Sequence, residues 1–106
     1  ILMSFQALIY AYEMNDRSVV SFECSQILNW HNSNDFTGKH ITINWTLGFI
    51  SGYNANALSR GKPYLSFPNR NINDIAYKHV IEFCQKDISK TSVDAVINLM
   101  KTLKLR

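Results

Sequence analysis

The residue types that most often do chemistry in proteins are present in this chain, but they are not spaced for it. The three histidines, His31, His40 and His79, are scattered and form no metal-binding pair of the H-x-x-x-H kind. The eight carboxylates include no neighbouring pair that suggests acid–base work, and there is no nucleophile elbow and no glycine-rich phosphate loop. We therefore expect no catalytic, cofactor-binding or metal-binding residues, and hence a protein that is not an enzyme.

The two cysteines, Cys24 and Cys84, are the other reactive groups. Two cysteines cannot form a structural zinc site alone, and no histidine lies at zinc-finger spacing from either of them. Their state depends on the compartment. In an exported protein they would form a disulfide, worth roughly 4 kcal/mol for a loop of about 60 residues in the chain-entropy model. In the cytosol they would be two small buried side chains.

Residues 1–11, ILMSFQALIYA, carry no charge and end in Ala11 before a polar stretch. Such a run is typical of the hydrophobic region of a secretory signal peptide whose charged beginning is missing, although Ile9 is large for its place near a cleavage site. The alternative is an N-terminal helix of the mature fold. We expect export, with residues 12–106 as a single mature domain, and the run is too short for a stable membrane span.

The composition is that of one globular domain. Of the 106 residues, 46% are hydrophobic and 12% aromatic, which suffices for a core, yet a domain of this size is marginally stable without further support. The net charge of +3 is mild. We expect the basic residues near the C-terminus to complement a helix dipole rather than to bind nucleic acid.

Apolar periodicity predicts four helices in the mature domain, separated by turn and loop chemistry. The predicted helical segments are 21–32, 41–58, 71–87 and 88–105, with a turn at 33–39 and a loop at 59–70. The third segment has one apolar stripe that should face the core, formed by Ile72, Ile75, Ala76, Val80, Phe83 and Cys84. In the last segment, Asp94 lies on the face opposite the apolar one. Side chains suited to helix caps stand near three of the starts. These are Ser21 for the first helix, Asn71 or Asn73 for the third, and Asp87 for the last.

The segment 41–58 is apolar on almost every side and yet contains two glycines, Gly48 and Gly52. A helix that is apolar all round is normally buried, and each glycine inside a helix costs roughly 1 kcal/mol relative to alanine. A close approach by another helix would explain that cost. We therefore predict that Gly48 and Gly52 form a contact groove facing a neighbouring helix, with Trp45 and Phe49 in the core.

The order of these features resembles that of small exported bacterial proteins grouped with the HdeA/HdeB-like periplasmic proteins. The shared pattern is an early cysteine, W-x-x-G-[YF]-[IL]-x-G in a central helix, and [YF]-C shortly before a final helix. The similarity covers roughly residues 22–103 and departs from the pattern at residues 87–88, where many relatives have Asn-Pro. The matching positions are Cys24, Trp45, Gly48, Phe49, Gly52, Phe83, Cys84 and Ala95.

The resemblance implies an all-α fold, a small four-helix orthogonal bundle in which one disulfide, Cys24–Cys84, joins two helices. Its best-known members are acid-stress chaperones that loosen at low pH and hold other exported proteins. We therefore expect a periplasmic, non-enzymatic chaperone whose partners are unfolded protein clients, with a homodimer among the expected assemblies and no nucleic acid among the partners. The Tai-type immunity proteins share the G-[YF]-x-x-G helix and cysteines, and they imply the alternative, a specific inhibitor of a secreted effector.

Overall fold

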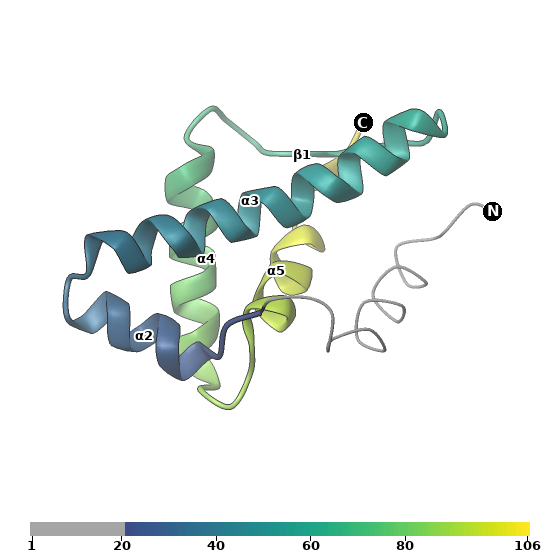
Figure 1. Cartoon of the computed structure of the whole chain (residues 1–106). Helices are drawn as coiled ribbons and strands as arrows, with labels where there is room; N and C mark the ends of the chain where they lie inside the picture. The colour runs from purple at the N-terminus through teal and green to yellow at the C-terminus, as the bar shows by residue number, and fades with distance from the viewer. Residues whose placement is uncertain (1–20) are drawn as a thin grey trace.

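The computed structural model describes residues 21–106, so the predicted signal segment 1–11 and the predicted start of the mature domain, 12–20, lie outside the described residues. The described part of the chain folds into helices joined by short connections, with one small antiparallel sheet (Figure 1). Within residues 21–106, the prediction of an all-α fold with four helices and one disulfide is confirmed. The elements are α2 (Cys24–Asn32), α3 (Phe36–Ser59), β1 (Leu65–Ser66), α4 (Ile72–Lys86), α5 (Ser92–Met100) and β2 (Lys104–Leu105).

The helices α2 and α3 form a hairpin, and α3 lies across α4 (Figure 1). The connection is shorter than the turn predicted at 33–39, because Asp35 is the N-cap of α3 rather than a turn residue. Its Oδ1 accepts a hydrogen bond of 2.9 Å from the backbone N–H of Gly38, which satisfies one of the free donors at the helix start. Asn34 has φ 56°, a left-handed conformation that asparagine tolerates well.

The closest approach within this hairpin is between Gly38 and Trp30. Gly38 is buried, and a Cβ atom added there would lie against the Cβ, Cγ and Cδ2 atoms of Trp30, well inside van der Waals contact. Any other residue would therefore force α2 and α3 apart. The chain does use a glycine for close helix packing, but at Gly38 and not in the central segment where the pattern suggested it.

After α3 the chain returns along a loop that carries β1, and β1 pairs antiparallel with β2 in the register Leu65↔Leu105. The loop is fixed to α3 by one amide side chain. Asn54 donates from Nδ2 to the carbonyl oxygen of Leu65 at 2.9 Å, and its Oδ1 accepts from the N–H of Leu65 at 2.8 Å. Leu65 is buried, so both of its backbone groups need partners inside the protein.

The buried apolar side chains form two clusters. The first, which we call the disulfide cluster, lies between α2 and α4 and includes one residue of α5. Its members are Cys24, Ile27, Leu28, Val80, Ile81, Cys84 and Ala95. The second, the α3–α5 cluster, draws mainly on α5 and is completed by α3, β1 and α4. Its members are Ile50, Leu65, Ala76, Val93, Val96, Ile97, Leu99 and Met100.

Two of the three predicted helix caps are wrong, and the third has the right position without the expected bond. Ser21 does not cap the first helix, because α2 begins at Cys24 and the cap position is held by the preceding residue, without a side-chain hydrogen bond. Asn71 does stand at the N-cap of α4, again without a side-chain bond. Asp87 does not cap the last helix, because α5 begins later, at Ser92.

Candidate functional site

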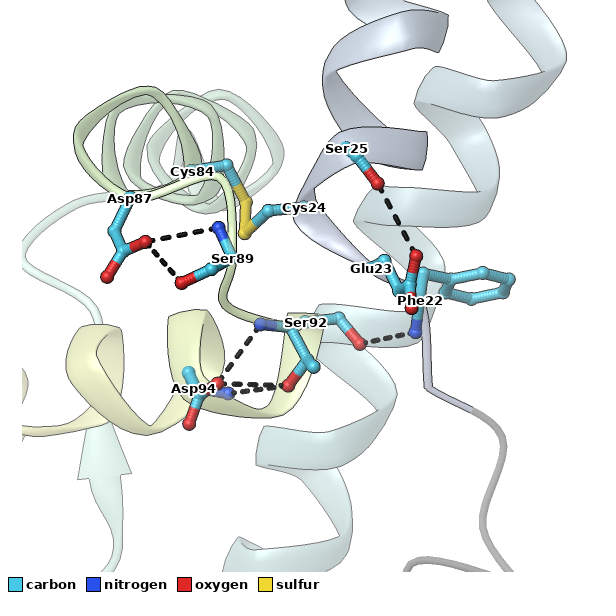
Figure 2. The surroundings of a disulfide bond; sticks show 10 residues. Phe22, Glu23, Cys24, Ser25, Cys84, Asp87, Ser89, Ser92 and Asp94 are labelled. Atoms are coloured by element: carbon cyan, nitrogen blue, oxygen red, sulfur yellow. Dashed lines mark hydrogen bonds between the residues drawn. A yellow bond between two sulfur atoms is a disulfide. The ribbon is translucent and has the colours of Figure 1, made fainter.

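The disulfide is the one covalent feature that the sequence predicted, and the structure contains it. Cys24, the first residue of α2, is bonded to Cys84 in the last turns of α4 (Figure 2). Both cysteines have no exposed surface. The bond therefore lies inside the core, out of reach of solution thiols while the fold is intact. Of the two states left open for the cysteines, the structure has the disulfide-bonded one.

Next to the disulfide, the chain entering α2 is hydrogen-bonded to the chain entering α5. The N–H of Phe22 donates to Oγ of Ser92 at 2.9 Å, and the N–H of Ser92 donates to the carbonyl of Phe22 at 2.7 Å. The N–H of Cys24 donates to the carbonyl of Lys90 at 2.9 Å. Figure 2 shows the Phe22–Ser92 contact beside the disulfide. These bonds attach the start of α5 to the crosslinked part of the molecule.

The start of α5 is held by a capping box in which Thr91 and Asp94 bind each other reciprocally. Oδ2 of Asp94 accepts from the N–H of Thr91 at 3.0 Å and from its Oγ1 at 3.2 Å, while the N–H of Asp94 donates to Oγ1 of Thr91. The sequence pattern had placed Asp94 on the outer face of the helix. Its carboxylate instead closes the first turn, so the order of α5 depends partly on an acidic group.

Asp87 has a separate role in the loop before α5. Its Oδ1 accepts hydrogen bonds from the N–H and the hydroxyl of Ser89, at 3.1 and 2.6 Å (Figure 2). These two bonds, helped by the charge of Lys90, lower the pKa of the Asp87 carboxyl below its usual value. Asp87 therefore stabilises the α4–α5 loop instead of the helix start predicted for it.

The predicted groove at Gly48 and Gly52 is not formed with any other described helix. Both glycines lie on the exposed side of α3, and no described atom lies within 4 Å of the place that a Cβ would occupy at either one. The prediction of a contact with α2, α4 or α5 is therefore wrong. The physical reason is the mismatch of length: α3 has 24 residues, whereas α2 and α5 have 9 each and cover only parts of its surface.

The three aromatic residues predicted for the core lie at its margin. Trp45 and Phe49 are half-buried, pack against the α3–α5 cluster and stand with ring centroids 5.6 Å apart. Phe83 is half-buried against the disulfide cluster. Each ring closes the edge of a cluster, so the aromatic residues of the shared pattern are packing residues in this fold.

A shallow groove of about 380 Å³ lies along the outer side of α4 and the α4–α5 loop. Within it, Nε2 of His79 and Oδ1 of Asn98 are 2.7 Å apart, which joins α4 to α5. Its lysines and carboxylates are equal in number, so it selects neither anions nor cations by net charge. The lining residues are His79, Glu82, Phe83, Lys86, Asp87, Lys90 and Asn98.

A second hollow, of about 190 Å³, lies where the α2–α3 turn meets α4. We call the side chains around it the aromatic corner: Trp30, His31, Phe36, Lys39, His40 and Tyr77. The Tyr77 hydroxyl and Nδ1 of His31 are hydrogen-bonded at 2.9 Å, and the ammonium of Lys39 stands 5.0 Å from the centre of the Tyr77 ring. Burial raises the pKa of the Tyr77 phenol.

The aromatic corner was not singled out from the sequence. Its residues come from three helices, and the pairing of His31 with Tyr77 across 46 positions leaves no local pattern. One signal was available. Asp35, a preferred N-cap residue directly before the apolar Phe36, marks the helix start, and this would have placed Phe36 and Lys39 on the first turn of α3 rather than in a turn.

The described residues contain no group of three or more histidines, cysteines or acidic residues placed to hold a metal ion. Among the helices of residues 21–106, none has the length and apolar character needed to cross a membrane. No protein-family model, curated protein or solved structure matches the chain.

Proposed function

We propose that the protein is an exported, periplasmic holding chaperone, which loosens in acid and binds unfolded clients without changing them chemically. The observation that supports this proposal is that the two clusters of the core are held together differently. The disulfide ties α2 to α4 through the disulfide cluster, whereas the α3–α5 cluster contains no covalent link among its members. Export fits the disulfide, because such bonds persist mainly in oxidising compartments.

Acid acts on this architecture through charge. At neutral pH the net charge is +3, and protonating the eight carboxylates and three histidines leaves only the cations of 11 Lys/Arg and 3 His. Charges of one sign on so small a domain repel each other and favour an expanded state. The repulsion is resisted by a crosslink in one cluster and by non-covalent packing in the other.

The starts of α3 and α5 are each held by an acidic side chain. Asp35 holds the first turn of α3, and Asp94 holds the first turn of α5. Neither helix start is held by a covalent bond, so each depends on side-chain hydrogen bonds when charge repulsion loosens the fold. Both helices contribute to the α3–α5 cluster, and we therefore expect this cluster to open first.

Opening of the α3–α5 cluster would expose apolar side chains while the disulfide keeps the chain compact. The residues released would include Val93, Val96, Leu99 and Met100, which have 8% or less of their surface exposed in the fold. A surface of aliphatic side chains that includes the flexible Met100 suits many unfolded clients because it needs no fixed complementarity.

The test measures both the loosening of the protein in acid and its ability to keep a client soluble. The oxidised protein, mixed with an acid-sensitive enzyme at about pH 2–3 and returned to neutral pH, should reduce light scattering by the client, and should do so less well after reduction. The Asp94→Asn variant should loosen at a higher pH than the parent, as followed by near-UV circular dichroism. Asp74→Asn is the matched control, because Asp74 lies in the first turn of α4 and caps nothing.

If the protein keeps its near-UV signal at that pH, or loosens without reducing client aggregation, the chaperone proposal fails. The alternative role, a specific protein-binding inhibitor or immunity protein, has a separate observation in its favour. Phe36 is 74% exposed in the aromatic corner of the folded protein, beside a hollow with polar and aromatic walls. A rigid surface of this kind serves a binder that acts without unfolding.

A further inference from the structure

Charge is distributed unevenly over the described part of the chain. Two segments, 59–66 and 101–106, contain five Lys/Arg and no Asp or Glu, whereas the other described residues contain five Lys/Arg against six Asp/Glu. We call the five cationic side chains of these two segments the basic end. They are Arg60, Lys62, Lys101, Lys104 and Arg106, and all of them are exposed.

The small sheet brings the two basic segments together. The N–H of Arg106 donates to the carbonyl of Tyr64 at 2.8 Å, and the N–H of Tyr64 donates to the carbonyl of Arg106 at 3.0 Å. Lys104 is the register partner of Ser66. Figure 1 shows the C-terminal end of the chain beside β1 and the last turns of α3. Cations separated by about 40 positions in the sequence therefore share one end of the fold.

The positive charge of the basic end is not neutralised within its own segments. Nε of Arg60 donates to the amide oxygen of Asn56 at 3.1 Å, and this acceptor is neutral. Complementing a helix dipole, the role expected for the C-terminal basic residues, suits Lys101 at the C-cap of α5. It does not suit Lys104 and Arg106, which lie beyond the helix in and after β2.

Two leucines lie exposed at the same end. Leu58 is 58% exposed and stands one helical turn after Asn54, the residue whose side chain holds Leu65. Leu105 is 62% exposed and is the register partner of Leu65 in the sheet. Both leucines therefore flank the same anchored residue, and each leaves most of an aliphatic side chain in water among cations.

We propose that the basic end binds the surface of a membrane that contains anionic lipids. The cations lie at the level of the phosphate headgroups, and Leu58 and Leu105 enter the boundary between headgroups and acyl chains. Clusters of four to eight Lys/Arg are typical of sites for anionic lipids, and stable attachment needs an apolar contribution as well as a polybasic one. The inference goes beyond the chaperone function, since it concerns the folded protein at neutral pH and needs no client.

The surroundings of the cations favour a lipid surface over a nucleic acid. A single strand of nucleic acid is bound by cations together with aromatic rings that are free to stack on bases. The rings in this part of the chain are half-buried, and Phe67 packs against the α3–α5 cluster. A nucleic acid would also leave Leu58 and Leu105 in water, whereas a membrane covers them.

The experiment measures sedimentation of the full-length, oxidised protein with vesicles at neutral pH. Vesicles of phosphatidylethanolamine and phosphatidylglycerol should bind the protein at least about tenfold more tightly than vesicles of phosphatidylcholine. Binding should be lost at about 1 M salt, where the Debye length is about 3 Å.

Variants separate the charge of the basic end from its leucines. Lys62→Glu/Lys104→Glu should weaken binding to the anionic vesicles at least about tenfold, and Lys62→Gln/Lys104→Gln should weaken it less. Leu58→Ala/Leu105→Ala should weaken it at least about fivefold without changing the salt dependence.

The matched control is Lys86→Glu/Lys90→Glu, which changes the net charge by the same amount in the shallow groove of α4. It should change the affinity by less than about threefold, because its charges lie away from the basic end. All the substituted residues are exposed. Urea midpoints equal to the parent's should therefore separate lost binding from lost folding.

Equal binding to neutral and anionic vesicles, or equal effects of the two pairs of charge reversals, would overturn the proposal. Tighter binding of a labelled oligothymidine or of polyglutamate than of anionic vesicles would overturn the membrane as the partner. So would a leucine variant that binds the vesicles as tightly as the parent. The assay contains no client protein, so none of these outcomes bears on the chaperone function.

Discussion

The two clusters of the core differ in what holds them together. In the disulfide cluster, α2 and α4 are joined by a fully buried covalent bond, and Cys24 and the chain that precedes it are hydrogen-bonded to the start of α5 and the residues before it. In the α3–α5 cluster, the members are held without a covalent bond, by packing together with one amide side chain, a two-stranded sheet and a capping box. The two clusters meet at α4 and α5, which contribute to both.

The presence of a crosslink in only one cluster indicates which part of the molecule unfolds locally at the lower cost. Local opening costs little where contacts are non-covalent and close to the surface, and it costs most where a crosslink restricts the open state. The α3–α5 cluster is bordered by half-buried aromatic rings and a short sheet at the C-terminal end. Hydrogen exchange should therefore be faster for amides of α5 than for those of α4 around Cys84.

The largest effect should come from removing the crosslink. We expect the Cys24→Ala/Cys84→Ala variant to lose about 4 kcal/mol of unfolding free energy, because the unfolded chain regains the entropy of a loop of about 60 residues. Urea unfolding followed by circular dichroism measures this. The difference in hydrogen exchange between α4 and α5 should then shrink. Equal stability of variant and parent would contradict the role given to the disulfide.

The next effect concerns Gly38. Gly38→Ala should cost about 1–3 kcal/mol or more, because a methyl group there collides with the ring of Trp30 and separates α2 from α3. Gly48→Ala is the matched control in the same helix. It should stabilise the protein by about 0.4–1 kcal/mol, since no described atom crowds that position. Thermal melts of both variants suffice, and a higher melting temperature for Gly38→Ala would refute the close contact.

Replacing Asn54 tests the stability of the α3–α5 cluster separately from that of the disulfide cluster. Asn54→Ala should cost about 1–3 kcal/mol, because the N–H and carbonyl of the buried Leu65 both lose their partner. The loss should be visible as faster hydrogen exchange in β1 and α5, with α2 unchanged. Asn44→Ala, an exposed position on the same helix, should change stability by less than about 0.5 kcal/mol. Equal effects of the two variants would mean that Asn54 does not anchor the loop.

The smallest effect should come from Asp87, which is fully exposed. Its pKa is lowered in the folded protein by the bonds from Ser89, so its stabilising contribution is present above the pKa of the unfolded state and is lost as the pH falls through the folded pKa. Asp87→Asn should therefore lower the urea midpoint slightly at neutral pH and leave it unchanged in strong acid. Ser89→Ala should reproduce this pattern, and a variant effect that persists in strong acid would contradict it.

Much of the local structure could be predicted from the sequence. The apolar stripe of α4, with Ala76, Val80 and Cys84 at helical spacing, predicted both its helix and its buried face. The start of α3 was predicted too late, since Asp35 and Gly38 together fit a turn, while Asp35 is equally a preferred N-cap residue. The burial of the central helix was overestimated at Gly48 and Gly52, because apolar composition cannot tell how much of a long helix its shorter neighbours cover.

The sequence by itself determined the helical class, the approximate helix limits and the two cysteines available for a crosslink, because these depend on residue types at short separations. The tertiary structure alone decided that the close glycine contact is at Gly38 and that His31 and Tyr77 meet beside Lys39. Contacts of this second kind depend on how helices of unequal length cross, and the crossing is set by the packing of the whole core.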